Sequence, residues 1–101
     1  MYGGESPGYG FDCSGLVAWS FARIGLRLPH SSYLLARLGR SVPPSALRPG
    51  DVLVFHGASH VGIYIGHGKF VHAPHTGTRV SVTPLAGAYR AELDTARRVV
   101  A

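Results

Sequence analysis

The hydrophobic pattern of this chain changes its period near residue 50, and that change limits the folds open to it. Before Pro49-Gly50-Asp51 the apolar residues recur at helical spacing, and after this turn they form short runs of strand length. Helices first and strands afterwards, joined by short turns, indicate an α+β fold with an antiparallel sheet of about four to five strands. The length of 101 residues fits one domain over residues 1–101.

The first helix is expected over residues 13–24. Four residues form its apolar stripe at positions i, i+4, i+8 and i+11: Cys13, Val17, Phe21 and Ile24. Asp12 suits the N-cap of this helix, and Gly25 suits its C-terminal stop. Because the stripe is the side that a helix buries, we expect Cys13 to point into the fold.

The remaining elements are predicted from turn residues and short apolar runs. A second helix is expected over residues 33–38, followed by a proline-marked link over residues 42–49. Strands are expected over residues 52–56, 60–65, 69–73, 79–83 and 96–100. No apolar run approaches the roughly 20 residues that span a bilayer, so membrane insertion is not predicted.

Cys13 is the only cysteine in the chain and is the first candidate for chemistry. A thiol at a helix N-terminus is close to unpaired N–H groups and the positive end of the helix dipole, which favour the thiolate. The thiolate is the nucleophilic form of cysteine. The alternative is that Cys13 is a small buried apolar residue, as most free cysteines are.

His56 ends one predicted strand at a turn, whereas His60 and His72 lie in the next two predicted strands, where alternation fixes the face they occupy. Alternation places His60 on the same face of its strand as Gly62 and Tyr64, and places Phe70 and His72 together on the next strand. The short turn between these strands makes them neighbours in a hairpin, so the two imidazoles are expected to lie close together. A cysteine and two histidines would supply a nucleophile, a base and a group that orients the base.

Metal and nucleic-acid binding are not predicted. His56 and His60 would be separated by about 13 Å in an extended strand, and the usual zinc-ligand spacing is absent. The net charge of +5 comes from arginines spread along the chain and not from a basic stripe with aromatic residues between the charges.

These residues and motifs resemble the NlpC-type family of cell-wall cysteine peptidases. The likeness covers nearly the whole chain in order: Tyr2-Gly3-Gly4, Phe11-Asp12-Cys13-Ser14-Gly15-Leu16-Val17, Leu28-Pro29-His30-Ser31-Ser32, Leu47-Arg48-Pro49-Gly50-Asp51-Val52-Leu53-Val54-Phe55, Ser59-His60-Val61-Gly62-Ile63-Tyr64-Ile65-Gly66 and Phe70-Val71-His72-Ala73-Pro74. The resemblance implies a reduced papain-like fold, in which the cysteine-bearing helix packs against an antiparallel sheet that carries the histidines.

The resemblance also implies a function, which is hydrolysis of amide bonds in the peptide stems of bacterial peptidoglycan. The expected bond joins γ-D-glutamate to the following diamino acid. By match, Cys13 would be the nucleophile, His60 the general base and His72 the residue that orients His60. Asp12 and Ser14 would help to hold the substrate, and no metal or organic cofactor is expected.

The resemblance further implies a location outside the cytoplasm, in the cell wall or periplasm, although the chain shows no signal peptide. We expect a monomer that is truncated at its N-terminus, because family members carry another helix and a tyrosine before the Gly-Gly. Three alternatives stay open: His75 as the third residue in place of His72, a same-fold amidase or esterase with another substrate such as in phage tails, and a non-catalytic wall-binding pseudoenzyme.

Overall fold

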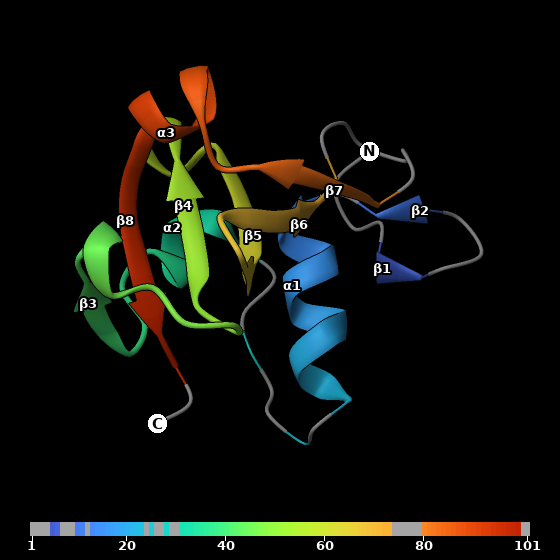
Figure 1. Ribbon diagram of the computed structural model, residues 1–101. Coiled ribbons are helices and arrows are strands. Elements are labelled where there is room, and N and C mark those ends of the chain that lie inside the picture. The colour runs from blue at the N-terminus through green and yellow to red at the C-terminus, as the bar shows by residue number, and fades with distance from the viewer. Residues whose placement is uncertain are drawn as a thin grey trace.

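A six-stranded antiparallel sheet in the order β3-β8-β4-β5-β6-β7 is the largest part of the fold (Figure 1). Its strands are β3 (Arg40–Val42), β4 (Val52–Phe55), β5 (His60–Gly66), β6 (Lys69–His72), β7 (Ser81–Pro84) and β8 (Leu93–Arg98). The computed structural model describes residues 5–6, 10–11, 13–23, 25, 28, 31–73 and 80–99. The α+β fold with an antiparallel sheet is therefore confirmed.

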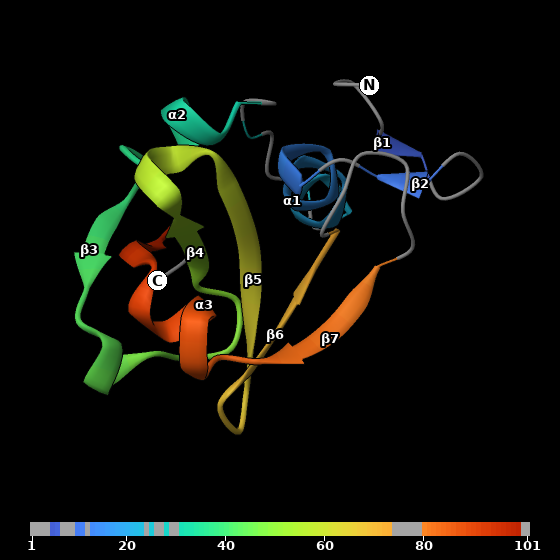
Figure 2. The same cartoon turned by 90° about the horizontal axis from the view of Figure 1, so that it is seen from above.

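Short helices and a small hairpin surround the sheet. They are α1 (Cys13–Ala22), α2 (Ser32–Leu35), α3 (Gly87–Ala91), the 3-10 turns η1 (Pro44–Ala46) and η2 (His56–Ala58), and the paired strands β1 (Glu5–Ser6) and β2 (Gly10–Phe11). Seen from above, the sheet curves around α3, while α1 and α2 lie on its outer side (Figure 2). No helix among the described residues is long and apolar enough to cross a membrane.

The sheet has an apolar core on each face, because neighbouring strand residues point to opposite sides. One core joins the helices to the sheet and contains Val17, Phe21, Leu35, Val52, Val54, Val61 and Ile63. The other lies on the α3 side and contains Val42, Leu53, Phe55, Phe70 and Ala96, with Tyr89 of α3 packed against it. The strands β4 and β5 therefore separate two packed layers.

The first helix begins at Cys13 as predicted and ends at Ala22, two residues before its predicted end. Its buried stripe is confirmed at Val17 and Phe21, which are 0% and 6% exposed. The other two members of that stripe, the Cys13 side chain and Ile24, lie outside the described residues. The second helix is shorter than predicted, because α2 ends at Leu35 and turns lead on to Gly39, whose backbone has a φ of 58°. A side chain at Gly39 would collide with the carbonyl oxygen of Arg98, so a close approach to β8 fixes this turn.

The predicted strand starts agree best with the structure in the run from β4 to β6, which includes the β5–β6 hairpin. The starts of β4, β5 and β6 at residues 52, 60 and 69 agree with the predicted runs, whereas β8 begins three residues before its predicted start. The sheet has six strands and not the predicted four to five, because β3 forms between the second helix and the predicted link over residues 42–49, where no strand was expected. The residues of β3 form backbone hydrogen bonds with β8, where Val42 pairs with Ala96. These two residues are 54 positions apart in the chain.

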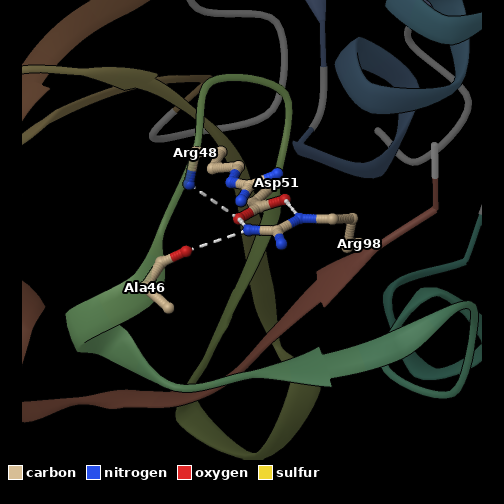
Figure 3. Close-up of polar contacts among 4 residues, drawn as sticks. All are labelled: Ala46, Arg48, Asp51 and Arg98. Atoms are coloured by element: carbon tan, nitrogen blue, oxygen red, sulfur yellow. Dashed lines mark hydrogen bonds and ion pairs between the residues drawn. The ribbon is translucent and has the colours of Figure 1, made fainter. Parts of the chain in front are cut away.

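A buried ion pair ties the turn before β4 to β8 (Figure 3). Asp51 is 2% exposed, and its carboxylate accepts hydrogen bonds from Arg98 Nε at 2.9 Å and Arg98 Nη2 at 2.7 Å. The Arg48 backbone N–H donates to the same carboxylate, and Arg98 also donates to the Ala46 carbonyl oxygen. Burial acts to raise the pKa of Asp51, but these hydrogen bonds and the arginine charges outweigh it and hold that pKa below its ordinary value.

Candidate active site

Two histidines on adjacent strands form the polar centre of the α3 side of the sheet. His60 is the first residue of β5 and His72 the last residue of β6. His60 Nε2 and His72 Nδ1 lie 2.8 Å apart, within hydrogen-bonding distance, and the ring planes are inclined at 75°. The prediction from strand alternation that these imidazoles lie close together is therefore confirmed.

Thr83 extends this hydrogen-bonded pair to a third strand. His72 Nε2 lies 2.9 Å from Thr83 Oγ1, so both nitrogens of the His72 ring have a side-chain partner. No role is predicted for Thr83 from the sequence, although it lies in the predicted strand over residues 79–83. The sequence carries no signal for this role: an apolar Val82 would be expected to face the core and Thr83 the solvent, but Val82 is exposed in the structure and Thr83 lies on the inward face.

Aromatic rings enclose the two imidazoles. The ring centroid of His72 is 4.5 Å from that of Phe70 and 5.2 Å from that of Tyr89, while the His60 ring lies 5.8 Å from Phe55. His72 is 1% exposed, and this burial lowers its pKa below the ordinary value because the charged ring loses its hydration. His72 is therefore neutral at pH 7 and carries a single ring proton.

The missing side chain of Gly62 leaves room for this arrangement. A Cβ at Gly62 would lie 2.8 Å from Phe70 Cδ2, 3.0 Å from the Val71 carbonyl oxygen and 3.2 Å from His72 Cβ. Gly62 thus faces the same side as His60, as alternation predicted. A larger residue here would press directly on the strand that carries His72.

Gly62→Ala is expected to lower the free energy of unfolding by about 1–3 kcal/mol, the usual cost of adding a methyl group to a full core. The new methyl group should also displace His72 from His60. Urea unfolding measures the first effect, and the ¹H–¹⁵N NMR signals of the two histidine rings report the second. Gly68→Ala is the matched control: its φ of 72° makes alanine strained, but its Cβ would meet nothing within 4 Å. Histidine signals in Gly62→Ala that match those of Gly68→Ala and the wild type would contradict the prediction.

Cys13 is the first residue of α1, as the sequence predicted. The backbone therefore places this cysteine at a helix N-terminus, where unpaired N–H groups and the helix dipole favour a thiolate. The Cys13 and Ser14 side chains, Asp12 and His75 lie outside the described residues, so the predictions about them stay predictions.

The histidines outside the pair are placed differently from it. His56 lies in the β4–β5 connection, where its Nδ1 is 2.7 Å from Glu92 Oε2, and His67 is exposed in the β5–β6 turn. Within the part of the chain that the structure describes, no three His, Cys, Asp or Glu side chains gather closely enough to hold a metal ion.

The chain belongs to the reduced papain-like α+β class. It has the two features of this class, which are a cysteine at the start of a helix and a hydrogen-bonded histidine pair on an antiparallel sheet. The model of the NlpC/P60 family matches residues 1–99, and the chain belongs to this family.

Relatives of known name support this assignment. The chain is 55% identical over 85 residues to the probable endopeptidase Rv2190c of Mycobacterium tuberculosis, covering 83% of this chain and 22% of that protein. It is 49% identical over 78 residues to the peptidoglycan endopeptidase RipA of the same organism, covering 75% of this chain and 16% of RipA. The solved structure of the peptidoglycan hydrolase RipB from M. tuberculosis matches with a TM-score of 0.81 and 34% identity, over 91% of this chain and 46% of that one. The chain therefore spans less than half of each of these relatives.

Proposed function

We propose that this chain is a cysteine endopeptidase domain that hydrolyses amide bonds in the peptide stems of bacterial peptidoglycan. The observation that carries the proposal is the 2.8 Å contact between His60 and the buried His72, in a family member whose cysteine opens α1. The names of the relatives support the substrate class, because RipA is a peptidoglycan endopeptidase and RipB a peptidoglycan hydrolase.

The first half of the proposed reaction forms a thioester. The Cys13 thiol gives its proton to His60, and the thiolate sulfur attacks the carbonyl carbon of the scissile amide. The backbone N–H of Cys13, at the start of α1, is a candidate donor to the oxyanion that develops. When the C–N bond breaks, His60 returns the proton to the leaving amine, and the acyl group remains on sulfur.

The second half releases the acyl group. His60 removes a proton from water, the resulting hydroxide attacks the thioester carbon, and the C–S bond breaks to give a carboxylic acid and the thiol. His72 orients the His60 ring through both steps, and Asp12 and Ser14 hold the substrate beside the nucleophile. No step in this sequence requires a metal or an organic cofactor.

The finer assignment is a D,L-endopeptidase that cuts between γ-D-glutamate and the following diamino acid. We propose that the enzyme acts outside the cytoplasm, in the cell wall or periplasm, because its substrate lies there. We further propose that residues 1–101 form a single catalytic domain that works as a monomer.

Mass spectrometry of muropeptide digests tests this function. Purified protein is incubated with muropeptides of known sequence, beside a sample first treated with iodoacetamide. Because Cys13 is the only cysteine, one alkylated thiol per chain identifies the modified residue without mutagenesis. We expect two product masses that place the cut after γ-D-glutamate, and no products from the alkylated sample.

Each of the other possible outcomes would support a different alternative. Products from the alkylated sample would exclude Cys13 as the nucleophile. Cleavage at another bond would overturn the D,L assignment and keep the peptidase. Retention of muropeptides on the immobilised protein without any product would indicate a wall-binding pseudoenzyme.

A further inference from the structure

The polar chain behind His60 ends at a threonine. His72 lies between His60 and Thr83, with contacts of 2.8 Å at Nδ1 and 2.9 Å at Nε2. The strand register explains the reach: Thr83 is paired with Phe70 and His72 with Ser81, so Thr83 is the diagonal neighbour of His72 across β6 and β7. The proton on a histidine ring is placed by the partners that its two nitrogens have.

We propose that Thr83 is a positioning residue for the hydrolytic reaction. Its hydroxyl oxygen accepts a hydrogen bond from His72 Nε2–H, which leaves His72 Nδ1 as the acceptor for His60 Nε2–H. This inference deepens the proposed function and rests on it for its catalytic consequence.

Proton counting favours this direction of the chain. A His60 that has taken the thiol proton is an imidazolium with a proton on each nitrogen, so its Nε2 must donate and His72 Nδ1 must accept. Neutral His72 then carries its own proton at Nε2, where it needs an acceptor. A threonine hydroxyl can accept through its oxygen while its own proton points elsewhere.

The opposite direction would block the reaction. If the Thr83 hydroxyl donated to His72 Nε2, the His72 proton would lie on Nδ1 and point at His60 Nε2. His60 could gain a proton there only if His72 gave up its proton and took one from Thr83, and an alcohol is far too weak an acid for that. The reaction therefore depends on Thr83 acting as the acceptor.

Packing leaves the His72 ring little other freedom. The ring is 1% exposed and lies against Phe70 and Tyr89, so it does not turn outward to find a new partner in water. The feature of His72 that can still vary is its tautomer, that is, which ring nitrogen carries the proton. Removing the Thr83 oxygen should therefore change the His72 tautomer and leave the fold intact.

Thr83→Val removes the oxygen at nearly constant shape, and Thr83→Ser keeps it. We expect kcat/KM for muropeptides to fall on the order of tenfold in Thr83→Val, within the range seen for residues that orient a functional histidine. Thr83→Ser should restore it. Two-bond ¹H–¹⁵N NMR spectra of histidine-labelled protein report the tautomer directly, with His72→Gln to assign the signal. The wild type and Thr83→Ser should show His72 as Nε2–H, and Thr83→Val should shift it to Nδ1–H.

Three results would overturn the proposal. They are a wild-type His72 protonated at Nδ1, an unchanged tautomer in Thr83→Val, and a Thr83→Val protein with wild-type kcat/KM. The tautomer spectra need no substrate. A wild-type protein that cleaves no muropeptide would therefore overturn the proposed function, while the spectra would still decide whether Thr83 sets the His72 proton.

Discussion

Cys13→Ala is expected to lower kcat/KM for muropeptides by at least about a thousandfold, because no other group in the proposed reaction can form the thioester. The loss should lie in kcat, since the substituted atom acts after substrate is bound. Alanine is the best helix former, so the melting temperature of the variant should not fall. Chromatography of timed muropeptide digests and thermal unfolding measure the two quantities.

Ser20→Ala is the matched control for this variant, because it removes a small polar group from the same helix and leaves the thiol in place. It should keep wild-type kcat. Residual cleavage by Cys13→Ala within tenfold of the wild type would contradict a cysteine mechanism. A loss of kcat in Ser20→Ala of similar size would show that the helix, and not the thiol, is the sensitive feature.

Asp51→Asn is expected to give a large loss of stability. It removes the negative charge that faces Arg98 in a site that is almost inaccessible to water, and breaking a buried ion pair at one partner costs about 3 kcal/mol or more. For a domain of this size the melting temperature should fall by about 10 °C or more. Urea unfolding at pH 7 measures the loss of free energy.

The same variant should also change how stability depends on pH. The pKa of Asp51 in the folded protein lies below its ordinary value, which is about 3.9 in the unfolded chain. Its contribution is therefore complete above that unfolded pKa and is lost as the pH falls through the lower, folded pKa. Wild type and Asp51→Asn should thus converge in acid.

Asp94→Asn is the control for Asp51→Asn. Asp94 is an exposed carboxylate that accepts a hydrogen bond from the Gly57 N–H, and its loss should have a small effect. An Asp51→Asn protein as stable as Asp94→Asn at pH 7 would contradict the importance of the buried pair.

The parts of this fold that could be predicted from the sequence are those set by neighbouring residues. The buried side of α1 follows from the spacing of Val17 and Phe21, and the meeting of His60 with His72 follows from strand alternation and a short turn. These features depend on contacts made within one element or one hairpin. The spacing of apolar and polar residues within one short segment is enough to predict them.

The parts that could not be predicted depend on pairings between distant segments. In the sequence Asp51 looks like an ordinary turn residue. Its partner Arg98 lies on β8, 47 positions away in the chain. Tyr89 lies in a helix of five residues, which is too short to show a period. Thr83 gains its role only through the register of β6 with β7. In each case the side chain is ordinary in the sequence, and its partner comes from elsewhere in the fold.

The position of β5 between the two cores has a consequence for how this protein can change. Val61 packs on the α1 side of β5, while its neighbour His60 faces the α3 side, so both packed layers fix the position of this one strand. Repacking of apolar layers is one of several routes by which proteins adapt their stability. A repacking of either layer would therefore move the start of α1 relative to His60. We therefore expect mutations accepted in one layer to be followed by compensating mutations in the opposite one, so that the two cores evolve together.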